Sequence, residues 1–445
     1  MRKKIGISLF MGMSIRNFEL AGIFQELNKD FDLVFFTTSE KVRDYIGNNY
    51  QIQMLPSPSP WLGRILAQLE PIQYYAFHFS RHPKTSTKYI LRDRDLTPFK
   101  WLLWSCLGRL WSKIEKVIPV AKIYTWLGSQ WDIDLSKVEE LFLLSYDVSL
   151  DKLLAGKAAS MGKPIHIAVH SWDNLPGRGY LPVIPTKLLV WNENMKSQAL
   201  TYHKLPPHLV TVFGAPQFRF YLNEKKSISL KLLEKIDPRL MEKNYIVYCC
   251  SASRVFPDEA QFIEELAKIS LDKKLLLVLR LHPNERKNEY IRKFGTNHNI
   301  ILSVAGDFFS ASIPRGTESG QLLQETYHFM ALMKYSITVI NLASTTSMDA
   351  IVHDTPAICV KFNLDPKMKS RWNQAARWYE SDHYDYMNSG KALLYSHNLR
   401  ELACQITECL EGRYPLDKMR EMTSNFVTDL DPRMIVSQIF KRRVP

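Results

Sequence analysis

The sequence predicts an α/β protein of two domains, each built on a parallel sheet wrapped by helices. The chain has 445 residues, which is too many for one compact core and about right for two domains. Short apolar runs alternate with amphipathic segments of helix length, the pattern of a parallel sheet covered by helices. The alternation pauses at 225–243, a charged and helical stretch, and restarts at Tyr245. This stretch is therefore the predicted linker between the domains.

The first half opens with a strand–helix–strand unit. Lys4–Met11 is an apolar run that predicts a strand, Gly12 ends it, and Phe18–Leu27 has apolar residues at helical spacing. The turn at 12–17 falls where ligands meet helix N-termini in such units. The next strand is predicted at Asp32–Thr37. The later elements of this half are strands at Leu141–Ser145, Pro164–His170, Lys187–Trp191 and Leu209–Phe213, and a helix at Leu150–Met161.

The second half repeats this pattern. Its predicted strands are Tyr245–Cys250, Leu275–Leu281, Ile300–Ser303, Ser336–Leu342 and Ala357–Val360, and its predicted helices are Asp258–Ile269, Gly320–Lys334, Ser347–His353 and Leu399–Leu410. The predicted domains are 1–224 and 244–425, with 426–445 as a C-terminal helix whose return to the first domain is left open. Pockets favour domain interfaces and the carboxyl ends of parallel strands. We therefore expect the two domains to face a central cleft.

Residues 56–130 are less regular and are predicted to form a helical insertion in the first domain. Within them, Phe99–Val117 carries aromatic and leucine side chains interleaved with basic ones at helical spacing, including Trp101, Trp104 and Trp111. Such a helix either lies in a membrane interface or is buried beneath the insertion. The sequence leaves both interpretations open.

Charge and cysteine content narrow the class of protein. The chain has 58 Lys and Arg against 45 Asp and Glu, a net charge of +13 that favours anionic partners. The basic residues are dispersed and no nucleic-acid reader motif appears, so nucleic acid is not the expected partner. The six cysteines form no CxxC pair, which makes a metal site unexpected and fits reduced cytoplasmic thiols.

The expected location follows from the apolar segments. No run reaches the ~18 apolar residues of a membrane span. The N-terminal apolar run lacks a cleavage site and is followed at once by Arg16 and Glu19, so it is interpreted as a strand and not as a signal peptide. We expect a cytoplasmic protein, with peripheral attachment to the inner face of the cell membrane left open.

Polar side chains follow the strands of the second half where each strand ends. Hydroxyls before a helix, a guanidinium and an imidazole are groups that bind a diphosphate. Four consecutive hydroxyls, Ser344–Ser347, exceed what helix capping needs, although capping explains any one of them. Asp349 either complements the helix dipole or accepts hydrogen bonds from sugar hydroxyls. The candidate donor-binding residues are Ser251, Ser253, Arg254, Arg280, His282, Ser344, Thr345, Thr346, Ser347 and Asp349.

The first half offers candidates for a catalytic base. His170 and Asp173 come directly after a predicted strand, and Asp147 follows the neighbouring one. Either Asp173, the preferred base, or His170 can deprotonate an acceptor hydroxyl. The alternative is that Asp173–Asn174 simply forms a turn before Pro176. The sequence contains no GxxxxGK[ST], HExxH or GxSxG motif, and no GxGxxG motif follows the first strand.

Several longer segments carry a resemblance to a known family. They are VHSWDNLPGRG at Val169–Gly179, KLLVWNENMKSQAL at Lys187–Leu200, VTVFGAP at Val210–Pro216, LRLHPNE at Leu279–Glu285, NLASTTSMDAIVHDTPAICV at Asn341–Val360 and DHYDYMNSGKALLYSHNLREL at Asp382–Leu402. With these segments the chain resembles GT-B-type glycosyltransferases of bacterial surface-polysaccharide biosynthesis. It is also similar to the wider group of CDP-glycerol glycerophosphotransferases and UDP-N-acetylglucosamine 2-epimerase-like proteins. The resemblance covers about residues 140–430.

The resemblance implies a fold, and it implies which ligand each half of the chain binds. The fold is two Rossmann-like domains facing a central cleft, the GT-B arrangement. In similar enzymes the C-terminal half binds the nucleotide donor through the His-Pro strand end and the Ser/Thr loop, and the N-terminal half binds the acceptor. An acidic residue after that loop meets the ribose or donor sugar; here it is Asp349, one methylene shorter than the usual Glu. Catalysis in this fold usually requires no metal, and no cofactor is expected.

The resemblance further implies a glycosyltransferase. It would move a sugar from a nucleotide sugar to a polysaccharide or lipid-linked acceptor in cell-surface glycan assembly. Two other enzymes fit the same pattern: a transferase of alditol phosphate from a CDP-linked donor, and a UDP-sugar epimerase. A fourth interpretation is a nucleotide-sugar-binding scaffold of a polysaccharide assembly complex, because the same fold hosts inactive relatives.

Overall fold

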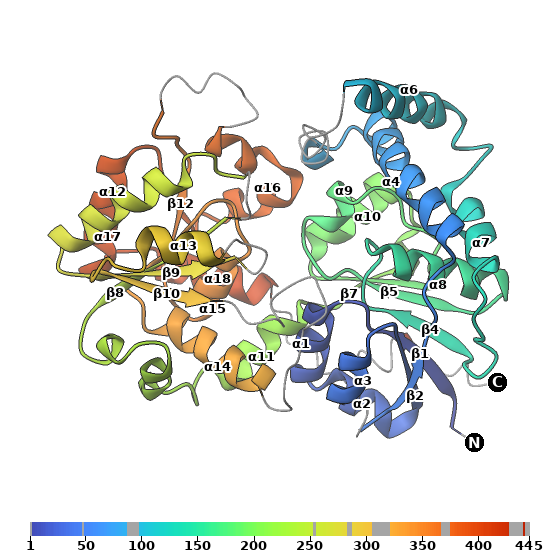
Figure 1. Ribbon diagram of the computed structural model, residues 1–445, viewed down its shortest axis with the longest axis horizontal. Helices are drawn as coiled ribbons and strands as arrows, with labels where there is room; N and C mark the ends of the chain where they lie inside the picture. The colour runs from blue at the N-terminus through green and yellow to red at the C-terminus, as the bar shows by residue number, and fades with distance from the viewer. Residues whose placement is uncertain are drawn as a thin grey trace. The chain divides into compact units, whose positions relative to one another are not determined.

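The computed structural model of the chain describes residues 2–46, 49–86, 98–251, 255–282, 287–304, 321–365, 374–426 and 439–440. The described residues fall into two units, each held together by its own contacts (Figure 1). Those of the first unit lie within Met1–Ala215 and Thr428–Pro445, and those of the second within Pro216–Val427.

The first unit is built on a parallel sheet. Among the described residues this sheet has seven strands in the order β3-β2-β1-β4-β5-β6-β7. The central strands are buried along almost their whole length, as expected for a parallel sheet covered on both faces. The order reverses between β1 and β4, the position at which ligands bind in open α/β sheets. The strands are β1 Lys4–Ser8, β2 Asp32–Thr37, β3 Gln51–Met54, β4 Glu140–Leu143, β5 Ile165–Ala168, β6 Lys187–Val190 and β7 Val210–Val212.

Helices cover both faces of this sheet. Helices α1, α2 and α3 lie on one face and α8 and α10 on the other (Figure 1), as right-handed crossovers in opposite directions require. The helices are α1 Gly12–Leu20, α2 Ile23–Asp30, α3 Glu40–Ile46, α4 Pro60–Arg81, α6 Pro98–Ile114, α7 Val120–Ser129, α8 Ser149–Ser160, α9 Asn174–Gly177 and α10 Glu193–His203, with short 3₁₀ turns at Lys84–Ser86 and Pro207–Leu209.

The predicted helix Phe18–Leu27 is wrong. Gly12 begins helix α1 a short loop after β1 ends at Ser8, and Gly22 interrupts the helical path with φ +74°. Such a left-handed conformation strains residues that carry a Cβ, so glycine is the residue found there. The helical apolar spacing therefore runs across two helices, α1 and α2.

The stretch 56–130 consists largely of helices α4, α6 and α7. Helix α7 packs against α8 through two glycines: a Cβ added to Gly156 would overlap the carbonyl oxygen of Tyr124, and one added to Gly128 would overlap the amide nitrogen of Lys157. Such a close approach of two helix backbones requires residues without side chains. The helices of this stretch thus pack closely onto the α/β part of the unit.

The second unit repeats the architecture. Its described residues form a six-stranded parallel sheet in the order β10-β9-β8-β11-β12-β13, reversing between β8 and β11. Helices α12 and α13 cover one face, and α14 and α15 the other (Figure 1). The strands are β8 Tyr245–Cys249, β9 Leu276–Leu281, β10 Ile300–Val304, β11 Val339–Asn341, β12 Ala357–Val360 and β13 Leu394–Ser396. The helices are α11 Pro216–Glu224, α12 Glu259–Asp272, α13 Lys287–Phe294, α14 Gln321–Lys334, α15 Thr346–Val352, α16 Asp382–Ser389, α17 Leu399–Leu410 and α18 Leu416–Phe426, with 3₁₀ helices η4 Leu230–Lys235, η5 Pro238–Met241 and η8 Ala375–Glu380.

The division between the units falls between Ala215 and Pro216, ahead of the predicted linker 225–243. The residues of that stretch belong to the second unit, where η4 and η5 lie. The Nζ of Lys334 donates to the carbonyl oxygens of Lys225 at 2.8 Å and Ile228 at 2.9 Å. The charges of this stretch indicate a surface segment, and these hydrogen bonds tie it to the end of α14.

The end of the chain contacts the first unit. The ring of Phe440 lies 5.3 Å from that of Phe31, 6.0 Å from Phe142 and 4.8 Å from His166, measured between ring centroids. Most of the predicted C-terminal helix 426–445 lies outside the described residues. Its described end, at Phe440, packs beside strands β2, β4 and β5.

Candidate functional site

The carboxyl ends of β9, β8 and β11 are neighbours in the second sheet, so the residues that follow them lie at one edge. A row of in-register residues crosses the sheet just below this edge. Ser303 pairs with Arg280, Arg280 with Cys249, and Cys249 with Asn341. In-register residues of parallel strands point to the same face. In this row Arg280 contacts Phe329 of α14, and Asn341 bonds to Ser347 of α15, so the face is the one that α14 and α15 cover.

The Ser/Thr loop between β11 and α15 is held by its own hydrogen bonds. Ala343 adopts φ +45°, and its N–H donates to the hydroxyl of Tyr379 at 2.9 Å. The N–H of Ser344 donates to Oδ1 of Asn341 at 3.1 Å, and the N–H of Thr346 donates to Oγ of Ser344 at 3.2 Å. A non-glycine residue in the left-handed region persists only where its surroundings hold it. The loop is therefore preorganised by Asn341 and Tyr379, neither of which the sequence analysis singled out.

The four hydroxyls of this loop are not equivalent. Ser347 is fully buried, donates to Oδ1 of Asn341 at 3.2 Å and lies 3.5 Å from Sγ of Cys359. Its hydroxyl supports the loop and does not face solvent. Ser344, Thr345 and Thr346 are only partly buried, but the hydroxyl oxygen of Thr346 is itself buried. Of the four predicted phosphate-binding residues, Ser344 and Thr345 are the best placed to meet a ligand.

Arg280 points toward the edge strand β10. Its Nη1 donates to Oγ of Ser303 and to the carbonyl oxygen of Val304, each at 3.0 Å. The guanidinium also lies 5.3 Å from the ring centroid of Phe329, a cation–π contact. The direction of the Arg280 side chain depends on Ser303, which lies 23 residues further along the chain. The sequence analysis did not predict this direction.

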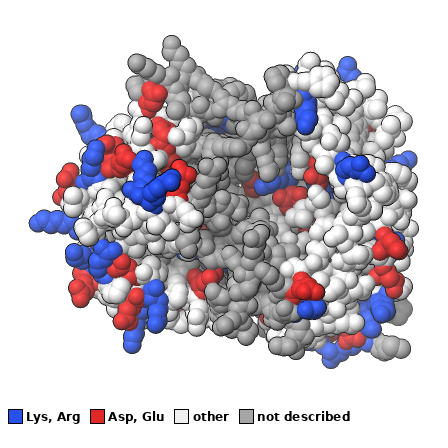
Figure 2. Space-filling view, viewed as in Figure 1, with Lys and Arg blue, Asp and Glu red and all other residues white. Residues whose placement is uncertain are grey.

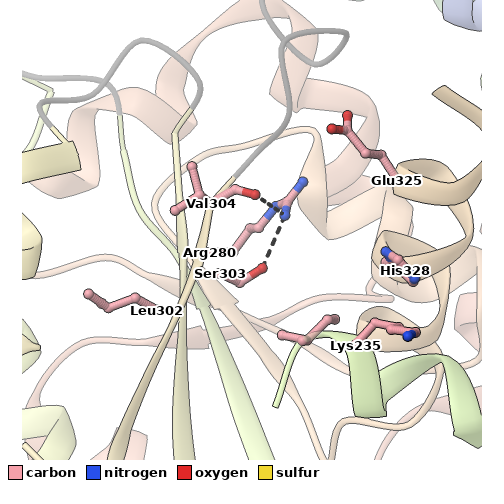
Figure 3. Close-up of a pocket in the computed structure, with 8 residues that line it drawn as sticks. Lys235, Arg280, Leu302, Ser303, Val304, Glu325 and His328 are labelled. Atoms are coloured by element: carbon pink, nitrogen blue, oxygen red, sulfur yellow. Dashed lines mark hydrogen bonds between the residues drawn. The ribbon is translucent and has the colours of Figure 1, made fainter. Parts of the chain in front are cut away.

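Arg280 lines a cavity of about 220 Å³ (Figure 3). Lys235 of η4 and His328 and Glu325 of α14 line the same cavity, which therefore collects three basic side chains and one acidic one. Burial, together with the charges of Lys235 and Arg280, lowers the pKa of His328 below its ordinary value. With His328 largely neutral at pH 7, Lys235 and Arg280 outnumber Glu325 by one charge, and this positive surplus favours an anion.

His282 and Asp349 complete the edge. His282 follows β9 two residues after Arg280, and burial lowers the pKa of its imidazole. A neutral imidazole at pH 7 still donates one hydrogen bond. Burial raises the pKa of the Cys249 thiol to about 12, and the charges of Arg280 and Asp349 act on this same thiol. Cys249 is thus an inert thiol flanked by two of the predicted donor-site side chains.

The loop after β8 is partly described. The N–H of Ser251 donates to Oε1 of Glu259 at 2.7 Å, and the same carboxylate accepts from the hydroxyls of Tyr248 and Tyr290, each at 2.8 Å. Burial raises the pKa of Glu259. Ser251 is therefore positioned by a buried acid that the sequence analysis missed. Ser253 and Arg254 lie outside the described residues.

In the first unit, His170 and Asp147 form a buried pair at the carboxyl edge of β4 and β5. The Nδ1 of His170 lies 3.4 Å from Oδ1 of Asp147, and Nε of Arg178 lies 3.3 Å from Oδ2. Ser145 donates its hydroxyl to Oδ1 at 2.6 Å. Burial by itself raises the pKa of Asp147, but the charges of His170 and Arg178 and the Ser145 hydrogen bond outweigh it and lower the pKa. Asp147 is thus an ionised carboxylate that orients His170.

Asp173 lies in a different environment from His170. It is buried directly before α9, and its carboxylate accepts the hydroxyl of Ser171 at 2.6 Å. This is the short local contact typical of turn-forming aspartates. Of the two candidate bases, His170 is the one whose imidazole lies beside a carboxylate, that of Asp147.

A second buried ion pair lies next to the pair of His170 and Asp147, and the sequence analysis did not predict it. Lys152 of α8 is fully buried, and its Nζ lies 3.0 Å from Oε1 of Glu70 in α4. Ser149 donates to the same oxygen at 2.8 Å. The buried Asp151 lies beside this pair, and burial raises the pKa of its carboxyl group. The two halves of the pair are 82 residues apart, so only the three-dimensional fold brings them together.

The three tryptophans predicted for membrane contact differ in their exposure. Trp104 and Trp111 face the interior of the unit and are each 9% exposed, whereas Trp101 is 42% exposed. Trp104 and Trp111 therefore do not form a contact surface. Within the described part of the chain, no helix is both long and apolar enough to cross a bilayer. The described residues also contain no group of three or more His, Cys, Asp or Glu side chains placed to hold a metal ion.

Comparison with known proteins identifies the fold. No protein-family model and no curated protein matches the sequence. Solved structures do match: the UDP-GlcNAc 2-epimerase of Methanocaldococcus jannaschii has a TM-score of 0.54 at 14% identity, over 99% of this chain and 100% of that one. S. aureus MnaA, solved with UDP, has a TM-score of 0.54 at 13% identity, over 98% and 96%. A glycosyltransferase from Rickettsia africae ESF-5 has a TM-score of 0.50 at 12% identity, over 99% of both chains.

The chain therefore has a GT-B-like fold of two Rossmann-like α/β units, as the sequence predicted. At these identities the likeness defines the architecture and leaves the reaction to be argued from the residues themselves.

Proposed function

We propose that the protein is a glycosyltransferase that moves a sugar from a nucleotide sugar to a glycan or lipid-linked acceptor of cell-surface glycan assembly. The observation that carries the proposal is the set of polar side chains at the carboxyl edge of the second sheet. There Arg280 stands near the end of β9, His282 follows it, and the Ser344–Thr345 hydroxyls and Asp349 follow β11, at the carboxyl edge of a fold shared with proteins that bind UDP.

The proposed donor site is built for a leaving diphosphate. When the bond between the sugar C1 and the diphosphate oxygen breaks, negative charge develops on the leaving oxygens. Preorganised donors and cations stabilise that charge far better than water does. Arg280 and the basic cavity it lines would supply positive charge, while His282, Ser344 and Thr345 would donate hydrogen bonds. Asp349 would accept hydrogen bonds from the hydroxyls of the ribose or the donor sugar.

We further propose His170 as the base. Its Nδ1 faces Asp147, which leaves Nε2 to take the proton from an acceptor hydroxyl. The acceptor oxygen then bonds to the sugar C1, and the nucleoside diphosphate leaves. An ionised Asp147 stabilises the imidazolium that forms, as a carboxylate does in other histidine-base sites. Asp173 remains the second candidate, because its carboxylate lies three residues from His170.

A UDP-sugar epimerase is the second candidate function. Several of the compared structures, among them that from Methanocaldococcus jannaschii, are UDP-GlcNAc 2-epimerases, and this chain matches nearly their whole length. The two reactions differ in their need for an acceptor. An epimerase converts its nucleotide sugar without one, whereas a transferase leaves the donor intact until an acceptor is added.

The test begins with thermal-shift titrations against UDP, GDP, CDP, CMP and dTDP. We expect one base to stabilise the protein selectively. The matching nucleotide sugar is then incubated with the protein, with and without a bacterial membrane or glycan extract as acceptor. Sugar transfer only in the presence of the extract supports the transferase, and a new nucleotide-sugar epimer without it supports the epimerase. Selective CDP binding with alditol-phosphate transfer would instead indicate the phosphotransferase, and tight binding without any turnover the scaffold.

The proposal places this reaction in the cytoplasm. All six cysteines are free, with Cys106 and Cys404 exposed. Exposed free thiols persist in reducing compartments and are oxidised in secretory ones. A lipid-linked acceptor would be met at the inner face of the cell membrane.

A further inference from the structure

Helix α6 has a buried side that fixes it to the first unit. Trp104, Gly108 and Trp111 follow one another at intervals of four and three residues and form one buried stripe. A Cβ added to Gly108 would overlap that of Tyr75 in α4, so the two helices touch backbone to backbone there. The indole N–H of Trp111 donates to the carbonyl oxygen of Ile118 at 3.1 Å. These contacts set which side of α6 faces outward.

The outward side of α6 is also apolar. Phe99, Leu103, Leu107, Leu110 and Ile114 recur at intervals of four and three residues and are all exposed. Phe99 is 72% and Leu110 57% exposed, and the apolar surface continues past the helix with Val117 and Ile118. Monomeric proteins seldom expose contiguous apolar stripes of this length, and a stripe of this kind marks an interaction surface. We call these seven residues the outer stripe.

The charges around the outer stripe have one sign. From 96 to 114 the sequence contains no Asp or Glu, whereas it contains Lys100, Arg109 and Lys113. The four-residue spacing of Arg109 and Lys113 places them along one flank of the stripe, where the Arg109 guanidinium lies 4.7 Å from the ring centroid of Phe79 in α4, and Lys116 follows the end of the helix. In Figure 2 the surface over α6, at the upper right, is mainly white with basic side chains around it.

The first acidic residue after helix α6 is turned inward. Glu115 accepts Nη1 of Arg81 at 2.6 Å and is also bonded by the hydroxyl of Tyr180. Its charge is therefore matched within the unit, and it does not oppose the basic flank. The remaining charge of this surface complements an anionic partner.

We propose that the outer stripe of α6 docks the protein on the surface of an anionic lipid bilayer. An amphipathic helix with apolar residues on one side and basic residues along its flank lies at the boundary between headgroups and acyl chains. The basic flank would meet anionic headgroups, a contact that weakens as salt rises. This docking goes beyond the proposed reaction, and it would bring the enzyme to an acceptor whose lipid anchor lies in the same bilayer.

Vesicle co-sedimentation of the full-length protein tests the proposal. The vesicles contain phosphatidylcholine alone or phosphatidylcholine mixed with phosphatidylglycerol. We expect the wild type to bind the mixed vesicles at least tenfold more tightly than the neutral ones, and less tightly at high salt. The variant Leu103→Glu with Leu110→Glu should lose this binding at least tenfold. The control, Leu271→Glu with Ile291→Glu, changes two exposed apolar residues of α12 and α13 and should bind like the wild type.

Three outcomes would overturn the proposal. One is absence of binding to either vesicle, and another is equal binding by the wild type and the α6 variant. The third is a concentration-dependent dimer that the α6 variant splits, without vesicle binding, since the stripe would then be an interface between two copies. Thermal-shift titration of the α6 variant with nucleotide keeps this result separate from the donor-site proposal, because nucleotide binding should be unchanged in that variant.

Discussion

His170 and Asp147 form a buried pair in which Nδ1 of the imidazole lies 3.4 Å from Oδ1 of the carboxylate. The second carboxylate oxygen is occupied by Arg178 at 3.3 Å. The same ring nitrogen lies 3.3 Å from the side-chain amide of Asn174, so Asp147 and Asn174 together hold the orientation of the ring. This relationship is the structural reason to assign the proton transfer to His170 ahead of Asp173.

The first prediction follows from this pair. Replacement His170→Ala should lower the turnover rate by about 10²-fold or more, the usual contribution of a general base. Asp147→Asn should also lower it, because the imidazolium loses its partner, while nucleotide affinity should stay within twofold of wild type for both. Steady-state rates and nucleotide titrations measure the two effects separately. Asp173→Asn is the matched control, and loss of turnover there with retention in His170→Ala would reassign the base.

The second prediction concerns the buried pair of Lys152 and Glu70, whose charged atoms are 3.0 Å apart. Lys152→Met should destabilise the protein by about 3–5 kcal/mol, because it leaves the Glu70 carboxylate without its partner. The double variant Lys152→Met with Glu70→Gln should recover much of that loss. Urea denaturation of the wild type, of the single variants Lys152→Met and Glu70→Gln, and of the double variant measures the coupling. Purely additive losses in the double variant would show that the pair is not coupled.

The third prediction tests the glycine contact between α7 and α8. Gly156→Ala places a methyl group against the carbonyl oxygen of Tyr124 and should destabilise the protein by roughly 1–3 kcal/mol. Gly63→Ala in α4 is the matched control, because a Cβ there meets nothing within 4 Å. Alanine is the better helix former by about 0.5–1 kcal/mol, so the control should raise stability. A gain in thermal stability for both variants would show that the two helices can separate.

The fourth prediction is a pH effect from His353. Burial lowers the pKa of this histidine to about 4, while its Nδ1 lies 2.7 Å from the carbonyl oxygen of Asp349. Between about pH 6.5 and about pH 4 the unfolded chain binds a proton that the folded protein does not. The folded state is therefore favoured above about pH 6.5 and loses up to about 1.4 kcal/mol per pH unit below it.

Urea denaturation at a series of pH values checks this effect. The variant His353→Gln should show a flatter fall in the free energy of unfolding over that window. All other titrating groups are common to the two proteins, so the difference between the two curves isolates the imidazole. Parallel curves would mean that His353 takes up its proton without unfolding the protein.

Central strands were the easiest elements to predict. Strand β2 at Asp32–Thr37, strand β12 at Ala357–Val360 and helix α17 at Leu399–Leu410 have the predicted bounds. A buried parallel strand is an apolar run bounded by polar residues, which is visible in one dimension. Strands β3 and β13 were missed. Each lies at the edge of its sheet, and β3 carries the polar Gln51 and Gln53 in place of an apolar run.

For the candidate site, the sequence predicted which residues follow each strand and did not predict where their side chains point. Placing His282 and the Ser344–Ser347 loop at the same edge required only the strand order of a parallel sheet. That Ser347 is buried against Cys359, and that Arg280 turns toward Ser303, depends on neighbours 12 and 23 residues away. Side-chain direction of this kind follows from packing, which periodicity does not encode.

The claim that the second unit binds a nucleotide diphosphate is tested most directly by isothermal titration of the selected nucleotide into wild type and donor-edge variants. His282→Ala, and Ser344→Ala with Thr345→Ala, should each weaken binding about tenfold or more, since hydrogen bonds to charged groups contribute about 1.5–3 kcal/mol. His298→Ala removes an exposed histidine of the same unit and should bind like wild type. Wild-type affinity in both folded donor-edge variants would contradict the assignment of this edge as the donor site.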